Sequence, residues 1–206
     1  CPTIIAENGI NTFLNVIVPA INSGLKHFVF FSSMAVYGHQ KPPFTEKMPK
    51  DPVDIYGACK SVIEDMLKVL SEVHGFTYTI LRPYNVYGER QSLTDPYRGV
   101  VALFINNFLK GKPVSVYGDG LQKRMYTYIN DIVPYIADCA NSPGAVNEIF
   151  NIGDERTRTI KELIETIEEV SGIKVPVIHL EDRAQEVKFA YSDNSKIKRI
   201  MGLEIK

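Results

Sequence analysis

The chain has 206 residues, of which 45% are hydrophobic and 23% are charged, and its net charge at pH 7 is -1. This composition is ordinary for a soluble globular protein. The nearly neutral charge argues against a nucleic-acid partner, because phosphate recognition normally needs a basic face. No apolar run approaches the roughly 20 residues of a membrane span and no signal peptide opens the chain, so we expect no membrane association. The three cysteines are too scattered to form a zinc site, and they fit a reduced, cytoplasmic setting.

Hydrophobic periodicity and chain breakers divide the sequence into alternating helices and strands. The first elements predicted are a helix over 7–23, a buried strand over 28–31, a loop over 41–52, a helix over 56–74 and a strand over 78–81. The later ones are helices over 100–109, 131–140, 159–171 and 194–201 and strands over 114–117 and 149–152. Pro134 falls in the expected first turn of its helix, where proline is tolerated. Apolar strands that alternate with amphipathic helices predict an α/β fold around a parallel sheet, with the shorter elements after Arg82 forming a smaller lobe.

Tyr56 and Lys60 are four residues apart at the start of a predicted helix, so their side chains share one face. A tyrosine is a poor base at neutral pH, because moving its pKa from about 10 to about 7 requires roughly 4 kcal/mol. A partly desolvated ammonium group and a cationic cofactor ring could together supply that amount. A surface pair with no role is the alternative, since this spacing is common in helices.

Ser33 directly follows the predicted strand over 28–31, and ligands bind at the carboxyl ends of parallel strands. A hydroxyl there can hydrogen-bond a substrate hydroxyl and relay its proton to Tyr56. The alternative is a serine that only caps the loop. The order strand, Ser-Ser, Val-Tyr-Gly, proline loop and Tyr-x-x-x-Lys is much more specific than any of its parts.

These motifs resemble the extended short-chain dehydrogenase/reductases, and within them the nucleotide-sugar epimerases of the UDP-glucose 4-epimerase type. The matching segments are 31–38 (FSSMAVYG), 56–60 (YGACK), 81–88 (LRPYNVYG), 117–124 (YGDGLQKR), 150–153 (FNIG) and 192–196 (SDNSK). They occur in the family's order and cover nearly the whole chain. The resemblance implies the C-terminal part of a Rossmann-like parallel sheet plus a small lobe that binds a sugar nucleotide. We expect residues 1–90 and 125–155 to form an incomplete NAD-binding domain, and residues 91–124 and 156–206 to form the substrate lobe.

The resemblance also implies the chemistry. Tyr56 would be the base, Lys60 would hold the nicotinamide ribose of NAD, and Ser33 would bridge to the substrate. The sugar 4-hydroxyl would lose its proton while hydride passes from C4 to the cofactor, and hydride would return to the other face. Three further residues would lie beside the cofactor: Asn8, Ser32 and Tyr84.

Four residues would hold the substrate by the same resemblance. Asn85 would touch its phosphate or sugar side, and Arg124 and Arg183 match two arginines that bind the diphosphate, where a guanidinium can bind two oxygens at once. The match is looser at Arg183, because the usual Gly-Asp after it is replaced by Gln185-Glu186. Ala190 matches a sugar-pocket position, and its small side chain would admit UDP-GlcNAc and UDP-GalNAc beside UDP-Glc and UDP-Gal.

Met34 and Ala35 restrict which of the reactions of the related enzymes this chain could catalyse. Related 4,6-dehydratases carry an Asp-Glu pair after the catalytic Ser/Thr, since loss of water needs an acid and a base. Related decarboxylases carry a Glu in the same segment. Met34 and Ala35 cannot move a proton, so epimerisation remains.

The Gly-x-x-Gly-x-x-Gly turn that receives the NAD pyrophosphate is not found among the 14 glycines. Roughly the first third of an epimerase would therefore be absent, and we expect the 206-residue chain alone neither to bind NAD tightly nor to turn over. Two interpretations remain open: part of an ordinary epimerase, which we favour, or a short non-catalytic product that binds a sugar nucleotide or a partner. By analogy with the family, the helices over 7–23 and 56–74 would pair two copies into a homodimer.

Overall fold

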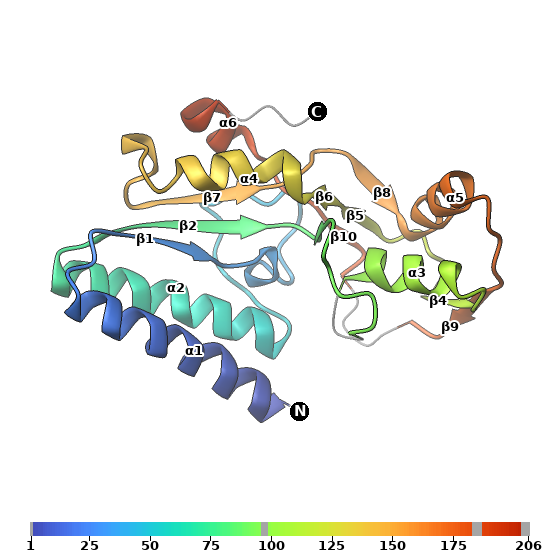
Figure 1. The fold of residues 1–206 in the computed structure, drawn as a ribbon, viewed down its shortest axis with the longest axis horizontal. Helices are drawn as coiled ribbons and strands as arrows, with labels where there is room; N and C mark the ends of the chain where they lie inside the picture. Colours follow the sequence, from blue (N-terminus) through green and yellow to red (C-terminus); the bar gives the residue numbers. More distant parts are fainter. Residues whose placement is uncertain (1, 96–98, 183–186, 203–206) are drawn as a thin grey trace.

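The computed structural model describes residues 2–95, 99–182 and 187–202. Its helices are α1 (Pro2–Asn22), η1 (Met34–Val36), α2 (Ile55–His74), α3 (Val100–Leu109), α4 (Ile129–Asp138), η2 (Pro143–Ala145), α5 (Ile160–Ser171) and α6 (Ser195–Met201). Its strands are β1 (His27–Phe31), β2 (Thr77–Pro83), β3 (Val86–Tyr87), β4 (Val114–Tyr117), β5 (Lys123–Met125), β6 (Thr127–Tyr128), β7 (Glu148–Ile152), β8 (Thr157–Thr159), β9 (Val177–Leu180) and β10 (Phe189–Ala190). The predicted α/β class is confirmed, and Figure 1 shows the elements gathered into two parts.

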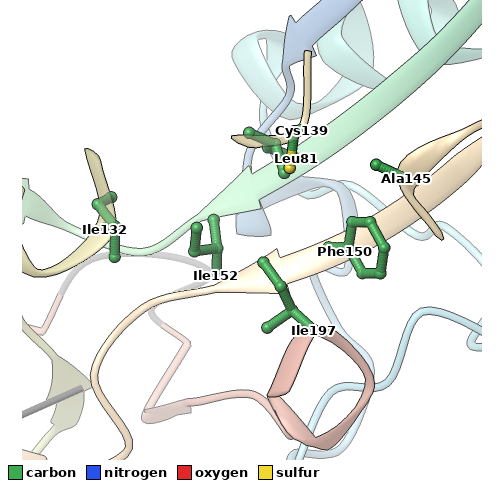
Figure 2. Close-up of a cluster of buried hydrophobic side chains, with 7 residues drawn as sticks. All are labelled: Leu81, Ile132, Cys139, Ala145, Phe150, Ile152 and Ile197. Atoms are coloured by element: carbon green, nitrogen blue, oxygen red, sulfur yellow. The ribbon is translucent and has the colours of Figure 1, made fainter. Parts of the chain in front are cut away.

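The first part, which we call the sheet body, is built on a parallel sheet in the order β1-β2-β7. Helices cover both faces, α1 and α2 on one and α4 and α6 on the other (Figure 1). On the α1/α2 face, Phe13 and Ile17 of α1 pack with Ile63 and Leu67 of α2 against Ile80 of β2. On the other face, a cluster fills the space between β2, β7, α4 and α6, and Figure 2 shows its members: Leu81, Ile132, Cys139, Ala145, Phe150, Ile152 and Ile197. Burial from both sides explains the continuous apolar run of β2, whereas β1, predicted to be buried, is only partly so and its Phe31 is 45% exposed.

Helix α1 corrects the expectation that no segment is long and apolar enough to span a membrane. Its segment Thr3–Asn22 is long and apolar enough to cross a membrane by length and composition, and little of it is buried. We missed it because isolated polar residues interrupt the apolar run, although Glu7 is its only charged residue. The same test is passed by helices of soluble proteins, and α1 packs on α2, with the space beside Gly9 filled by the Cys59 side chain.

The second part, which we call the lobe, contains α3, α5 and the strands β4, β5, β8, β9 and β10. Strands β4 and β9 pair in parallel, and a separate sheet has the order β10-β5-β8. Phe104 and Phe108 of α3 pack with Ile160 and Ile164 of α5 in a buried cluster. Short strands β3 and β6 pair where the chain passes between sheet body and lobe.

Several details differ from the expectations. Helix α4 begins at Ile129, so Pro134 lies inside the helix and not in its first turn. The short strands of two or three residues were not predicted, because so few residues carry no periodicity. Ile197 of α6 packs in the cluster of Figure 2, although residues 156–206 were assigned to the lobe. The division into two functional domains stays a prediction.

Candidate active site

Strand β1 brings Ser32 and Ser33 to the carboxyl edge of the sheet. The Ser32 amide donates to the Leu81 carbonyl of β2 at 2.8 Å, which extends the ladder one residue past the strand. Ser33 then stays extended and begins η1, where its Oγ accepts a hydrogen bond from the Ala35 amide at 3.2 Å. The predicted loop cap therefore exists. The same side chain also takes part in a second contact, described next.

Helix α2 places Tyr56 against Ser33. Asp54 caps the helix by accepting from the Gly57 amide at 2.7 Å, so Tyr56 lies in the first turn. A Cβ at Gly57 would come within 2.5 Å of the Ala35 carbonyl oxygen, so only glycine lets this turn approach η1 so closely. The approach brings the Tyr56 hydroxyl near enough to the Ser33 hydroxyl to influence the pKa of Tyr56.

The protein alone does not make Tyr56 a base at neutral pH. Burial raises the pKa of Tyr56 above its ordinary value. The nearby Ser33 hydroxyl lowers it by less than burial raises it, and the Asp54 charge raises it further. The Lys60 ammonium lies 5.7 Å from the centre of the Tyr56 ring. The sequence led us to expect that Lys60 lowers the pKa of Tyr56, but in the protein alone burial outweighs any such lowering.

Lys60 joins α2 to the end of β1. Its Nζ donates to the Phe31 carbonyl at 2.7 Å and lies 4.9 Å from the centre of the Phe30 ring. Burial lowers the pKa of Lys60, and the Glu64 carboxylate one turn further along α2 opposes that change. Ser33, Tyr56 and Lys60 are thus brought together as predicted, at the carboxyl end of β1.

The cofactor residues predicted from the sequence lie in different surroundings. Ser32 is 2% exposed, and its Oγ has no hydrogen-bond partner within the described part of the chain. An unsatisfied polar atom at this edge, beside an ammonium with donors to spare, fits a polar ligand such as NAD. Asn8 is exposed on α1. Tyr84 is fully buried, so any contact that it makes with a ligand must come from its backbone.

Asn85 lies just beyond β2 in an unusual backbone conformation. Its φ of 25° is positive, which Asn tolerates better than most residues and which is common at functional sites. Its Nδ2 donates to the Met125 carbonyl at 2.8 Å, and its own carbonyl accepts from the Thr127 amide at 3.3 Å. Asn85 therefore links the carboxyl end of β2 to the chain that leaves β5 of the lobe.

Arg124 and Ala190 are direct neighbours, because they are paired in the β5–β10 ladder. Arg124 Nη1 donates to the carbonyls of Lys123 at 2.9 Å and Lys188 at 3.2 Å. Ala190 is only 2% exposed and packs in a cluster with Tyr37 and Tyr84, so its methyl group is part of the core in this structure. Arg183 lies outside the described residues.

The structure adds residues that the sequence did not single out. Arg158 of β8 lies directly opposite Arg124, a pairing of two short strands that leaves no local signal. Glu64 and Arg82 form a buried ion pair next to the triad. The sequence pattern could have pointed to Glu64, since Tyr56, Lys60 and Glu64 follow one another at helical spacing.

A cavity of about 630 Å³ lies between α3 and α5, and none of Ser33, Tyr56 and Lys60 lines it.

Comparison with known proteins decides the family. Residues 2–153 match the NAD dependent epimerase/dehydratase family. The chain belongs to this family. The resemblance stated from the motifs is thereby confirmed, and with it the dependence of the family on NAD.

Individual members of the epimerase/dehydratase family differ in reaction. A UDP-N-acetyl-alpha-D-glucosaminuronate decarboxylase from Bacillus cytotoxicus is 35% identical over 80% of this chain and 52% of its own length. The UDP-glucose 4-epimerase of Thermotoga maritima, solved with UDP-glucose, has a TM-score of 0.92 at 32% identity, covering 100% of this chain and 66% of that one. A UDP-N-acetylglucosamine 4-epimerase from Methanobrevibacter ruminantium has a TM-score of 0.89 at 31% identity, covering 97% and 64%. The chain thus spans between about half and two thirds of the length of these relatives.

Proposed function

We propose that this chain carries the catalytic residues of an NAD-dependent nucleotide-sugar epimerase, acting at C4 of a UDP-hexose. The observation that carries the proposal is that helix α2 brings Tyr56 and Lys60 to Ser33 at the carboxyl end of β1. Parallel sheets bind ligands at that edge. A hydroxyl, a phenol and an ammonium group there suit the removal of a proton from an alcohol.

Each residue has a separate task in this proposal. Ser33 Oγ hydrogen-bonds the sugar 4-hydroxyl, and Tyr56 Oη takes the proton and later returns it. Lys60 binds a cofactor ribose hydroxyl and is held in place by the Phe31 carbonyl. When bound, NAD supplies the hydride acceptor and a positive ring. That positive charge favours the phenolate of Tyr56, whose pKa burial raises in the protein alone.

Met34 and Ala35 favour epimerisation over the other reactions of the family. They form η1 directly after Ser33, and neither side chain can donate or accept a proton. Dehydration and decarboxylation, as described above, use carboxylates in this segment. Decarboxylation is the second candidate, because a decarboxylase is among the relatives.

The diphosphate of the substrate would be bound in the lobe, at Arg124 with Arg183. Arg158, directly opposite Arg124 in the β5–β8 ladder, would add a second guanidinium for the diphosphate. A small residue at Ala190 would admit N-acetylated sugars. Since Ala190 is buried, substitution by Tyr would overpack the core, and direct comparison of UDP-Glc with UDP-GlcNAc is the better test.

The remaining expectations also stay proposals. A homodimer is supported by apolar side chains exposed on α1 and α2, among them Val16, Val62 and Val69. A cytoplasmic setting is supported by Cys59 and Cys139, which are free thiols. A non-catalytic binding product remains the alternative to an enzyme.

The test uses the protein expressed from its complete coding sequence. Incubated with NAD and UDP-Glc, UDP-GlcNAc or UDP-glucuronate, it should interconvert C4 epimers, read by chromatography. Tyr56→Phe should lower kcat by about 100-fold or more, whereas the control Tyr78→Phe should not. A pentose product from the glucuronate would favour decarboxylation, and wild-type protein without any turnover would favour the binding product. Turnover by the 206-residue chain alone would overturn our expectation that it is incomplete.

A further inference from the structure

A buried ion pair lies directly behind the candidate triad. Glu64 follows Lys60 by one turn of α2 and is fully buried. It accepts from Arg82 Nε at 2.9 Å and from Arg82 Nη2 at 2.7 Å. Burial alone would lower the pKa of Arg82, but the hydrogen bonds and charge of Glu64 outweigh it and hold the pKa above its ordinary value. Arg82 therefore keeps its positive charge inside the sheet body.

The ion pair continues into a chain of hydrogen bonds that reaches Tyr37, at the end of the segment that Ser33 begins. Arg82 Nη1 donates to the Tyr37 hydroxyl at 2.8 Å, and this hydroxyl donates to Asn151 Oδ1 at 2.6 Å. Tyr37 ends η1, the short helix that Ser33 begins. The chain thus connects α2, which carries Tyr56 and Lys60, through β2 to η1 and β7.

Stability alone does not explain such a network. Removing two charges from water costs several kcal/mol per ion, and a well-packed apolar pair of similar volume is often as stable or more stable. An apolar pair, however, does not fix the relative orientation of its two side chains, as hydrogen bonds do. Bidentate bonds fix Arg82 relative to α2, and its third donor fixes the Tyr37 hydroxyl.

We propose that Glu64 is a positioning residue, which with Arg82 and Tyr37 holds the helix bearing Tyr56 and Lys60 at a fixed distance from the segment bearing Ser33. The inference rests on the proposed function of these three residues. It concerns their mutual placement, and Glu64 itself touches no substrate.

The charged groups around Lys60 and Glu64 show how removal of the Glu64 carboxylate would affect Lys60. Lys60 faces Glu64 and Tyr56 from its own helix, and from β1 it meets the Phe31 carbonyl and the Phe30 ring. Glu64 faces Arg82 from β2 and the Lys50 ammonium at 3.9 Å from the preceding loop. Glu64 thus supports the positive charge of Lys60, so its loss should move the titration of Lys60 to lower pH.

The first experiment measures kinetics in the protein expressed from its complete coding sequence. Glu64→Gln keeps the shape and removes the charge, and Tyr37→Phe removes one hydroxyl from the chain. In both, kcat should fall by about 10- to 100-fold because the reacting groups are misplaced, with KM little changed. In Glu64→Gln the alkaline limb of the kcat profile should also move to lower pH. Glu165→Gln is the matched control, since Lys161 and Glu165 have the same spacing on an exposed helix.

The second experiment does not depend on turnover. Lysine labelled with ¹³C at Cε is titrated by NMR in the same protein, and the Lys60 signal is assigned from its absence in Lys60→Arg. The midpoint of Lys60 should fall in Glu64→Gln and stay in Glu165→Gln. An inactive wild type would overturn the proposed function, while the titration still tests whether Glu64 supports the positive charge of Lys60. An unchanged midpoint, or full kcat in Tyr37→Phe, would overturn the inference, and Tyr37→Phe decides alone if Glu64→Gln does not fold.

Discussion

In the sheet body, the candidate catalytic side chains are held by short-range geometry, whereas in the lobe the candidate substrate residues depend on pairings between distant short strands. Tyr56 and Lys60 share a helix face, and Ser33 follows a strand by two residues. Arg124 and Ala190 meet only because β5 and β10, of three and two residues, pair in register. In the proposed function, the chemistry that needs fixed distances therefore lies on long elements, and the diphosphate is bound by short ones.

The sheet body and the lobe also differ in how deeply they bury ion pairs. The sheet body buries the Arg82–Glu64 pair almost completely. The ion pairs of the lobe stay near water, as between Lys161 and Glu165 on α5. A buried pair is costly to break because the remaining partner keeps its charge without water, whereas an exposed pair contributes little.

Breaking the buried pair should give the largest effect. Arg82→Leu leaves Glu64 buried without its bidentate partner and should lower the free energy of unfolding by about 3–5 kcal/mol. Arg156→Leu is the control, because Arg156 is 61% exposed in its ion pair with Asp154, and it should cost at most about 1 kcal/mol. Urea unfolding followed by circular dichroism measures both. Equal losses would show that burial does not separate the two pairs.

The contact between α2 and η1 should be the next most sensitive feature. Gly57→Ala places a methyl group 2.5 Å from the Ala35 carbonyl oxygen, so the helix or η1 must move. We expect a loss of about 1–3 kcal/mol from overpacking. The first turn of α2 would also separate from Ser33, so activity should fall more than stability. Gly99→Ala is the control, because its Cβ would meet nothing within 4 Å. Full activity in Gly57→Ala would contradict the need for close approach.

The sequence predicted the long elements well and the short ones poorly, for one physical reason. The bounds of α3 and β4 agree with the structure, because the periodicity that predicts them acts within a few residues. Tyr56 and Lys60 were paired by their helical spacing, and Ser33 was added from its place after a strand and from the order of the motifs. The pairing of β5 with β8 and β10 leaves no such pattern, so the neighbour Arg158 was missed.

The sequence also did not reveal which individual side chains, such as those of Ala190 and Glu64, are buried. Ala190 was predicted to line the sugar pocket from its place in a motif, and the structure buries its methyl group. The partnership of Glu64 with Arg82 depends on how α2 packs on β2. Both facts depend on tertiary packing, which helical or strand spacing does not encode.

The smallest effect should come from the cap of α5 in the lobe. Thr159 Oγ1 accepts from the Glu162 amide at 3.0 Å, and Glu162 accepts from the Thr159 amide. Thr159→Ala should cost about 1 kcal/mol, because the first turn loses its cap, while kcat stays unchanged because the triad is in the sheet body. Thr166→Ala is the matched control: its hydroxyl only donates back to the Glu162 carbonyl within the helix, so its loss should be near neutral. Thermal unfolding and the kcat of both variants are measured together. A fall in kcat for Thr159→Ala would show that the lobe and the sheet body are coupled more closely than their separate cores suggest.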